Sequence, residues 1–567
     1  MYRTTFGALL IATLPGFAAN HKIAPDLSRA EHGSSVDVIV QFHNAPSQSH
    51  HQRVGKHGGI LHKTLDVINA AHYSIPAAAL QALADDPDVA YISPDHQLTG
   101  TADYAEAAVN ASIAYGYGWD GTGIGVAVLD SGIANHPDLK NSKGALRVVY
   151  SEDFVGGGTD DHYGHGQAVA GIIGGNGASS SGSNYFLTFR GVAPNVNLIN
   201  LRVLDQNGHG TDATVIAGIQ QAIKLKSKYK IRVMNLSLGR PVYESYKLDP
   251  LCAAVEQAWK AGIVVVVAAG NEGRNNSQGV SGYGTIQAPG NDPYVLTVGA
   301  MKTMETTSAG DDCIASYSSK GPSAVDHIVK PDVVAPGNRM TSLMASTARL
   351  ENAYPANAVP LKSYETTGSG ALSNVYYIMS GTSMAAPVVS GAAALLLQKS
   401  PSLTPDQVKA ILMRTARKTF PFSSVATDPA TGATYTSYYD LFTVGAGYVD
   451  VWAALNFNSV PPATSTALSP TASYNATTGA LTITNTGALD IWSGNASTLL
   501  AVNTVWGDNV LWAINTVWGD NTLWVNNTVW GDGTNQALRT LWSSASLWAS
   551  SSITSTESVP IIIAGEK

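Results

Sequence analysis

The chain has few charged side chains and almost no cysteine. Charged residues make up only 13% of the 567 residues, and the net charge at pH 7 is −8. The sequence contains no run of lysine and arginine, and this argues against a nucleic-acid-binding protein. Cys252 and Cys313 are too few for a disulfide framework, and one bridge between them and two free thiols both stay open.

Long apolar runs are missing after the first twenty residues. No later segment reaches about 18 uninterrupted apolar residues, so we expect no transmembrane segment. Residues 1–19 combine one arginine, an apolar stretch and small residues at their end. This pattern is typical of a secretory signal peptide cleaved near Ala18 or Ala19, which predicts an extracellular protein; the alternative is a first helix of the folded chain.

Small residues, by contrast, are abundant. The chain has 55 glycines and many alanines, valines and serines, a composition that favours a densely packed enzyme over a disordered protein. A chain of this length predicts about two to four folding units. We assign a signal peptide to residues 1–19, an N-terminal unit to 20–100, a main domain to 101–456 and an extension to 457–567.

The N-terminal unit has a compact core segment, residues 36–97. Strand-like and helix-like patterns alternate there as strand, helix, strand, helix, strand, which predicts a small α+β sandwich of the split βαβ type. Nine of the 14 histidines fall in the first 100 residues, several of them between His43 and His62. Their spacing is irregular, so we expect a solvated loop there rather than a zinc site.

Residues 101–456 alternate buried-looking strands with helical segments. The strands are continuous runs of valine, isoleucine and alanine, such as 263-IVVVVAAGN-271, without polar alternation. Such runs predict a parallel sheet covered by helices on both faces, which is a doubly wound α/β domain. Functional groups of such a domain lie in loops at the carboxyl ends of its strands.

Residues 457–567 have a different composition. A linker rich in proline, serine and threonine is followed by a twelve-residue repeat that starts at 501, 513 and 525, and seven of the 11 tryptophans fall between Trp506 and Trp548. The repeat predicts a β-rich extension of stacked short strands. Internal stacking of the tryptophans is favoured over contact with a glycan or a surface, which stays an alternative.

Three loops of the main domain carry the residue types of nucleophilic catalysis. Asp130 ends a buried strand, while His165 and Ser383 each precede an apolar helical run. Serine becomes a nucleophile when a histidine takes its proton, and a buried carboxylate orients that histidine. Pro387 is expected in the first helical turn, where its missing N–H costs little. The amide of Asn271 ends a fourth strand and is placed to donate to the oxyanion.

In these loops the chain resembles the subtilisin-like serine proteases (subtilases, peptidase family S8). The resemblance covers about residues 105–456 and rests on the order and spacing of five motifs: LDSGI, GHGQAVAG, NLSLG, AAGNEG and GTSMAAP. It implies a serine endopeptidase with Asp130, His165 and Ser383 as triad and Asn271 at the oxyanion hole. It also implies that residues 20–100 are an inhibitory propeptide, removed by the enzyme itself near 97–105.

The resemblance extends to the residues that bind polypeptide substrate. Substrate-binding positions are implied at Ser237, Leu238, Gly239, Ala268, Ala269 and Gly270. A strand of this kind pairs with an extended substrate through backbone hydrogen bonds, which tolerates many substrate side chains. Gln287 and Glu272 are expected at the rim of the specificity pocket, with solvated loop positions as the alternative.

The chain departs from the family pattern in three places. It reads 165-HGQAVAG-171, with Gln167 and Ala168 in place of the usual threonine and histidine, and His162 competes with His165 as the base. Asp138 matches a ligand of the family's calcium site, but a lone carboxylate does not form a calcium cage. No cofactor is required for the chemistry, and structural calcium stays open. Residues 343–378 form an extra segment, expected as a surface loop near the cleft.

Two other classes of protein compete with a protease. The first is a binding or adhesion protein whose tryptophan repeats act, with the main domain as a carrier. Occupation of all four catalytic positions argues against an inactive carrier. The second is an esterase, and the missing GxSxG motif counts against the α/β-hydrolase form of it.

Overall fold

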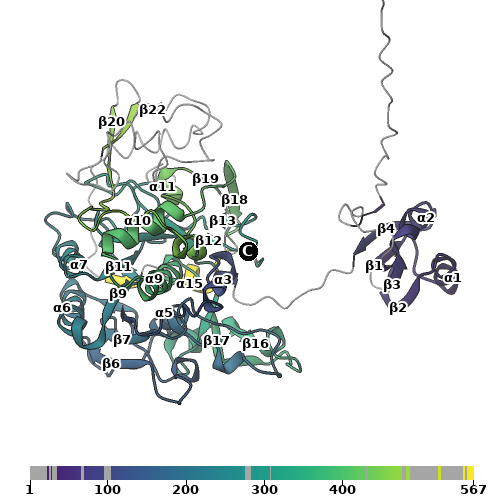
Figure 1. Cartoon of the computed structure of the whole chain (residues 1–567), viewed down its shortest axis with the longest axis horizontal. Coiled ribbons are helices and arrows are strands. Elements are labelled where there is room, and N and C mark those ends of the chain that lie inside the picture. Colours follow the sequence, from purple (N-terminus) through teal and green to yellow (C-terminus); the bar gives the residue numbers. More distant parts are fainter. Residues whose placement is uncertain are drawn as a thin grey trace, which may run out of the picture. The chain divides into compact units, whose positions relative to one another are not determined.

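The computed structural model divides the chain into two compact units, residues 1–99 and 100–567 (Figure 1). It describes residues 22–23, 27, 35–65, 69–94, 104–274, 282–306, 308–428, 431–475, 480–484, 522–524, 553–555 and 559–566. The predicted signal peptide lies outside the described residues, as do all of the tryptophan repeats except residues 522–524.

The first unit is a four-stranded antiparallel sheet with two short helices. Its strands follow the order β2-β3-β1-β4. Its elements are β1 (Ser35–Phe42), α1 (Gln48–Lys56), β2 (Ile60–Leu65), β3 (Ala70–Pro76), α2 (Leu80–Ala84) and β4 (Val89–Pro94). The predicted five-element pattern is wrong in the middle, because residues 60–76 form a strand pair where a helix and one strand were expected. The unit has its own apolar core, which includes Val38, Val40 and Ile92.

The histidine-rich segment is a helix, not the solvated loop that its spacing predicted. His50 and Val54 lie four residues apart on one face of α1 and are both buried. At its start, Nδ1 of His50 accepts a hydrogen bond from the Ser47 backbone N–H at 3.0 Å. The buried Val54 and the hydrogen bond at the start of α1 stabilise a helix, although the composition of the segment is typical of a loop.

The second unit is built on a sheet in which eight strands are described. Seven follow the order β13-β12-β11-β9-β5-β7-β6, β14 pairs with β12, and all pairs are parallel except β12 with β13. The strands are β5 (Gly125–Asp130), β6 (Val148–Asp153), β7 (Asn197–Arg202), β9 (Ile231–Leu236), β11 (Val264–Ala268), β12 (Leu296–Lys302), β13 (Cys313–Ile314) and β14 (Val333–Pro336). The doubly wound α/β prediction is confirmed.

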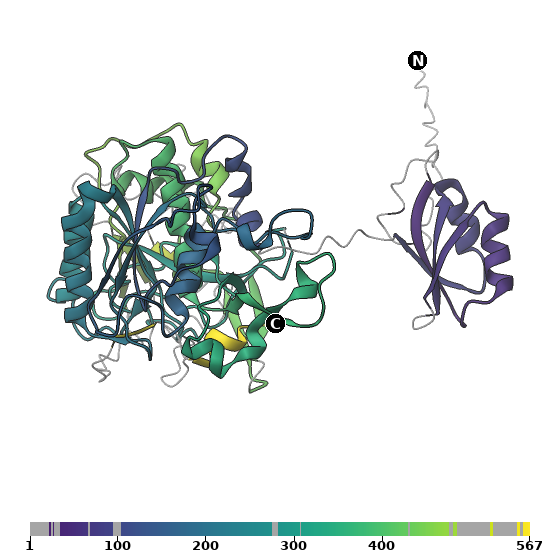
Figure 2. The same cartoon turned by 90° about the horizontal axis from the view of Figure 1, so that it is seen from below.

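Helices cover both faces of this sheet (Figure 2). Helices α5 and α9 pack against each other and against the sheet, and α6 packs with α7. Their bounds are α5 (His165–Gly174), α6 (Asp212–Tyr229), α7 (Pro250–Lys260), α9 (Thr382–Lys399) and α10 (Pro405–Thr415). Most of α9 is buried on all sides, which explains why its sequence is apolar and small throughout. Within the described residues, no helix is both long and apolar enough to cross a membrane.

The extra segment at 343–378 is folded, and the prediction of a surface loop is wrong. It contributes strands to the sheet β15-β17-β16 and carries a short helix, α8. Their bounds are β15 (Met340–Leu343), α8 (Arg349–Ala353), β16 (Ala358–Pro360) and β17 (Leu372–Met379). The backbone N–H groups of Arg349 and Leu350 donate to the carbonyls of His162 and Tyr163, so α8 lies beside the start of α5.

Glu351 of α8 is a buried carboxyl, only 2% exposed. One oxygen accepts a hydrogen bond from the Ala345 N–H at 3.2 Å, and the nearby Asp161 carries like charge. Burial, with a smaller contribution from Asp161, raises the Glu351 pKa from its ordinary 4.5 to about 8. Between pH 4.5 and 8, the folded chain therefore keeps a proton on Glu351, whereas the unfolded chain has already lost it.

The described parts of the extension belong to the second unit. Strands β20 (Thr471–Asn475), β21 (Ala480–Thr484) and β22 (Thr522–Trp524) form one small sheet. Strand β23 (Ile553–Ser555) and helix α15 (Val559–Ala564) follow. The hydroxyl of Ser469 donates to Asp332 Oδ1 at 2.5 Å, so the segment after residue 457 contacts the core of the second unit.

Replacing Glu351 by glutamine should stabilise the protein at alkaline pH. A raised carboxyl pKa means that stability falls as pH rises from 4.5 to 8, and a neutral amide removes that loss. We expect Glu351→Gln to gain about 1–3 kcal/mol over the parent at pH 9 and little at pH 5. Thermal unfolding on a Ser383→Ala background measures this, with exposed Glu244→Gln as control. An equal effect at both pH values would contradict the assignment.

Candidate active site

Asp130 is placed by a fully buried strand of the sheet. Every residue of β5 is buried, and Asp130 ends it with 1% of its surface exposed. Its Oδ1 accepts a hydrogen bond from the Ser131 backbone N–H at 2.7 Å. The carboxylate is thereby fixed at the carboxyl end of a central parallel strand, where α/β domains carry their functional groups.

His165 begins α5 and contacts Asp130 directly. The distance from His165 Nδ1 to Asp130 Oδ1 is 2.8 Å, and both side chains are buried. His162, the competing base, has an exposed side chain. The structure therefore brings His165 to the carboxylate. Gly164 precedes it with φ of +107°, and a Cβ at this position would collide with the Glu351 carboxyl, so glycine is required there.

A second buried carboxylate, Asp161, fixes the start of α5. Its Oδ1 accepts from the Ser131 hydroxyl at 2.8 Å and from the Gly164 N–H at 2.8 Å. Its Oδ2 accepts from the Gln167 N–H at 2.7 Å. Burial raises the Asp161 pKa, although these hydrogen bonds oppose the shift. Sequence analysis missed Asp161, and a carboxylate three residues before Gly164 was the available signal.

Gln167, the departure from the family motif, is a connecting residue. Its Oε1 accepts from the Ala134 N–H at 2.8 Å, which ties the loop after Asp130 to α5. Ala168 is fully buried in the core. With this changed motif, the contact between His165 and Asp130 is in place at 2.8 Å.

Ser383 is the second residue of α9, which begins at Thr382, and it is fully buried. Pro387 is not in the first turn as predicted, because it lies inside the helix, four residues after Ser383. It has no N–H to donate to the Ser383 carbonyl. The Ser237 hydroxyl donates to that carbonyl instead, at 2.8 Å. Ser237 is thus a partner of the helix carrying Ser383, and its side chain faces inward.

Asn271 is attached to the same helix start. The Thr382 backbone N–H donates to Asn271 Oδ1 at 2.9 Å. The Thr382 hydroxyl accepts from the Gly270 N–H at 3.1 Å. These two bonds place the Asn271 amide next to Ser383 and identify Thr382 as a positioning residue that sequence analysis did not single out.

The remaining predicted substrate-binding residues gather around Gln287. Ala268 ends β11, Ala269 follows it, and both are fully buried. Gly239 and Gly270 both lie against the Gln287 side chain, and a Cβ on either glycine would approach it within about 3 Å. Gln287 is buried, whereas Glu272 is exposed. The structure therefore brings Gly239, Gly270 and Gln287 together and leaves Glu272 at the surface.

The surroundings of Asp138 do not fit a calcium ion. Its Oδ1 accepts from the Ser179 N–H at 2.8 Å and its Oδ2 from the Tyr376 hydroxyl at 2.7 Å. Arg147 donates to its backbone carbonyl at 2.8 Å. A calcium site needs six or more oxygen ligands, whereas these neighbours are hydrogen-bond donors and a cation.

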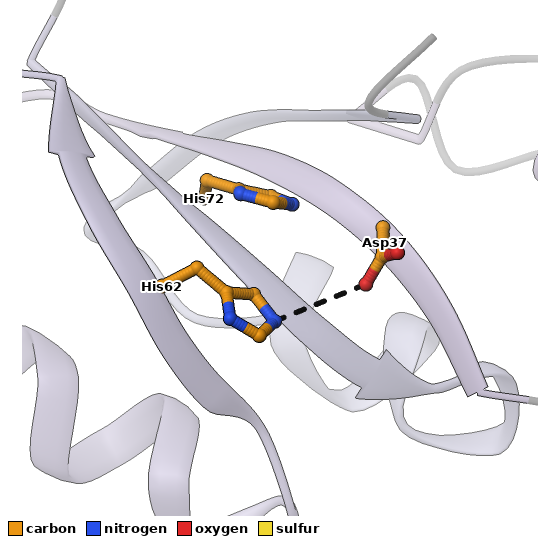
Figure 3. A group of neighbouring side chains, drawn as sticks. All are labelled: Asp37, His62 and His72. Carbon is orange, nitrogen blue, oxygen red and sulfur yellow. Dashed lines mark ion pairs between the residues drawn. The ribbon is translucent and has the colours of Figure 1, made fainter. Parts of the chain in front are cut away.

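One group of potential metal ligands is present among the described residues, and it lies in the first unit. Asp37, His62 and His72 point toward one another from β1, β2 and β3, with ligand atoms within 4.8 Å (Figure 3). The side chain set would suit zinc. His62 Nε2 lies 2.6 Å from the Ser74 hydroxyl, which also donates to Asp37, so a polar hydrogen-bonded cluster accounts for the arrangement.

Both cysteines are free, which decides the alternative left open by the sequence. Cys252 is buried in α7 and donates to Asn291 Oδ1 at 3.4 Å. Burial raises its thiol pKa far above the ordinary range, so it is not a reactive thiolate.

Comparison with known proteins agrees with this geometry. The subtilase family model matches residues 121–447, more than half of the chain. Serine protease AprX from Bacillus subtilis (strain 168) is 34% identical over 400 residues, covering 68% of this chain and 84% of its own length. Subtilisin E from the same strain is 33% identical over 367 residues, covering 64% and 79% respectively. The chain therefore belongs to the subtilase family and is a serine-type endopeptidase.

Proposed function

We propose that Ser383, His165 and Asp130 hydrolyse peptide bonds through an acyl-enzyme. The observation that carries this assignment is the 2.8 Å contact between His165 Nδ1 and Asp130 Oδ1, where His165 begins α5 and α5 packs against α9. His165 takes the Ser383 proton as Ser383 attacks the carbonyl, then returns it to the leaving amine. The same histidine activates the water that releases the acid product. Asp130 holds the imidazole orientation and stabilises its charged form.

Asn271 is proposed to stabilise the tetrahedral intermediate. Its amide oxygen is held by the Thr382 N–H, so the orientation of the whole amide is fixed before substrate arrives. The amide NH2 and the Ser383 backbone N–H donate to the developing negative charge. Such preorganised donors act in a buried site, where their electrostatic effect exceeds that in water.

Extended polypeptide is the proposed substrate, paired with Leu238 and Gly239. These residues form strand β10 (Leu238–Gly239), and both are buried beside the Ser237 that supports Ser383. Backbone pairing accommodates many sequences. A specificity pocket beside Gly239, Gly270 and Gln287 is proposed to accept an apolar or aromatic side chain before the cut.

The enzyme is proposed to be secreted and made as an autoprocessed zymogen. Residues 1–19 would direct secretion, and residues 20–100 would inhibit the enzyme until cleavage near 97–105. The first unit has its own core and exposes two large apolar side chains on β2, Ile60 at 63% and Leu61 at 41%, which supports a surface made for a partner. The tryptophan repeats are proposed to stack internally, with a glycan or surface as the alternative partner.

Loss of the nucleophile should prevent processing. Wild type should lose about 100 N-terminal residues on a gel and clear casein, because only it can form the acyl-enzyme. Ser383→Ala should keep the full length and leave casein intact. Adding a trace of wild type tests whether the mutant is still a competent substrate. Processing of the mutant alone at the wild-type rate would show that another protease removes the segment.

Two substitutions at Asn271 separate donation from positioning. Asn271→Ala removes the donor and should lower kcat by about 100- to 1000-fold with little change in KM. Asn271→Asp keeps the oxygen that accepts from Thr382 but replaces the NH2 by an anion, so kcat should fall at least as far. Steady-state kinetics on a peptide anilide measure both variants. Near-normal kcat in Asn271→Asp would mean that the residue only positions α9.

A further inference from the structure

The last described segment of the chain contacts the substrate-binding strand. This distal segment comprises residues 553–555 and 559–566. Strand β23 is the middle strand of a three-stranded sheet, between β10 and β8 (His209–Gly210). It runs antiparallel to both, with Ser555 opposite Leu238 and Ile553 opposite Gly210. The chain thus carries a strand of its own in the place where we expect extended substrate to pair.

Pairing at the edge of β10 that β23 occupies is exclusive. A strand edge has one row of backbone donors and acceptors, and a second extended chain cannot bind the row that is already used. The register covers Leu238 and Gly239, the two residues that directly follow Ser237. Occupation by β23 and occupation by substrate are therefore alternatives.

The second part of the distal segment is fixed beside the loop that carries Ser383. The Ser380 N–H, three residues before Ser383, donates to the Ile562 carbonyl at 2.9 Å. The Asn357 amide donates to the Ile563 carbonyl at 2.6 Å. Ile562 is fully buried in the main core. Figures 1 and 2 show α15, in yellow, within the body of the second unit.

Glu566 gives this segment a specific anchor. Its carboxylate is buried and lies 2.5 Å from Arg274 Nη2 and 3.5 Å from Lys302 Nζ. The Ser316 N–H donates to it at 3.0 Å. Asn338 exchanges two hydrogen bonds of 2.8 Å with the Glu566 backbone. A carboxylate with two cations and these donors satisfies the conditions under which a buried ion pair holds a segment in place.

The anchor site is built from the catalytic unit itself. Arg274 also pairs with Asp428 at 3.5 Å and stacks over the ring of Tyr435 at 5.2 Å. Lys302 ends the buried strand β12. These residues are held by their own elements, so a ready cationic pocket receives the Glu566 carboxylate. The strand pairing is short by comparison, with two residue pairs on each side.

We propose that the distal segment is a built-in competitive inhibitor, in which Glu566 anchors β23 across the substrate-binding strand β10. This inference rests on the proposed role of Leu238 and Gly239 in binding substrate. The strong anchor keeps the weak strand at high effective concentration, so a polypeptide must displace β23 before it reaches Ser383. Small acyl compounds that need no strand pairing are not subject to this competition.

Glu566→Gln in the full chain tests the proposal with two substrates. Hydrolysis of a tetrapeptide anilide, which needs the strand, should rise about tenfold or more in kcat/KM through a lower KM, since a buried pair that loses one charge is strongly weakened. Hydrolysis of p-nitrophenyl acetate, which does not need the strand, should stay unchanged. Glu305→Gln is the matched control, because Glu305 lines the same cavity of about 370 Å³ but is exposed and pairs with Arg339.

A synthetic peptide of residues 553–567 completes the test. Added to the Glu566→Gln enzyme, it should restore competitive inhibition of the tetrapeptide, and the same peptide with glutamine at 566 should inhibit at least tenfold less well. The proposal would be overturned if the variant showed unchanged tetrapeptide kinetics, or if both activities fell equally with lower thermal stability. The distal segment would then have only a structural role.

Failure of the proposed triad gives a different result. A wild-type enzyme that cleaves neither substrate and is not labelled at Ser383 by a fluorophosphonate would refute the triad, not the inhibitor. Fluorescence anisotropy of the labelled peptide on the Glu566→Gln chain then still decides the inference. Tight binding that requires glutamate at 566 and is competed by tetrapeptide supports it, and binding that tetrapeptide does not affect overturns it.

Discussion

The active site depends on how the start of α9 is tied to the ends of two neighbouring strands. A proline four residues after Ser383 leaves the Ser383 carbonyl without its helical donor, and the Ser237 hydroxyl from the end of β9 supplies the missing bond. Asn235 donates to that hydroxyl at 2.9 Å and accepts from Ser390 of α9 at 2.8 Å. One network therefore joins the helix and the strand at two points, and any shift of α9 would leave buried polar groups unsatisfied.

Buried hydrogen bonds also tie the start of α5 to the end of a strand, here β5. Asp161 accepts from the N–H groups of Gly164 and Gln167, while Ser131 links Asp161 to the end of β5. Asp130 and Asp161 are thus connected through a single serine, and His165 lies between their hydrogen-bonded loops. Buried carboxylates are costly unless such donors surround them. Here the hydrogen bonds to Asp130 and Asp161 offset the free energy of burying the two carboxylates, and they fix the position of His165.

The sequence allowed the sheet and the helices on both faces to be predicted because these depend on local patterns. It also pointed to Asp130 and His165, which the structure brings into contact. Continuous apolar strands and small residues before Ser383 are visible in any window of the chain. Pro387 was misplaced because the Ser383 carbonyl, which it leaves without a helical donor, has a remote partner in Ser237, 146 residues before Ser383. The helix α1 and the folded segment at 343–378 were missed for a related reason. Their stability comes from a few long-range contacts, such as buried Val54 and the bonds of Arg349 and Leu350 to residues 162–163.

The distal segment depends even more on long-range contacts, and its position could not be predicted from local patterns. In our proposal it binds the substrate-binding strand of the same chain. Glu566 lies 292 residues from Arg274 in the sequence, and nothing in its local pattern indicates that its carboxylate would be buried. Only the folded chain shows that Arg274, Lys302 and Ser316 form a cationic pocket beside the catalytic loop. Two residue pairs on each side are too few to hold β23 in place by themselves, and Glu566 by itself does not contact the substrate-binding strand β10. Joined in one segment, the anchor supplies binding free energy and the strand supplies position, and together they can oppose substrate without contacting the triad.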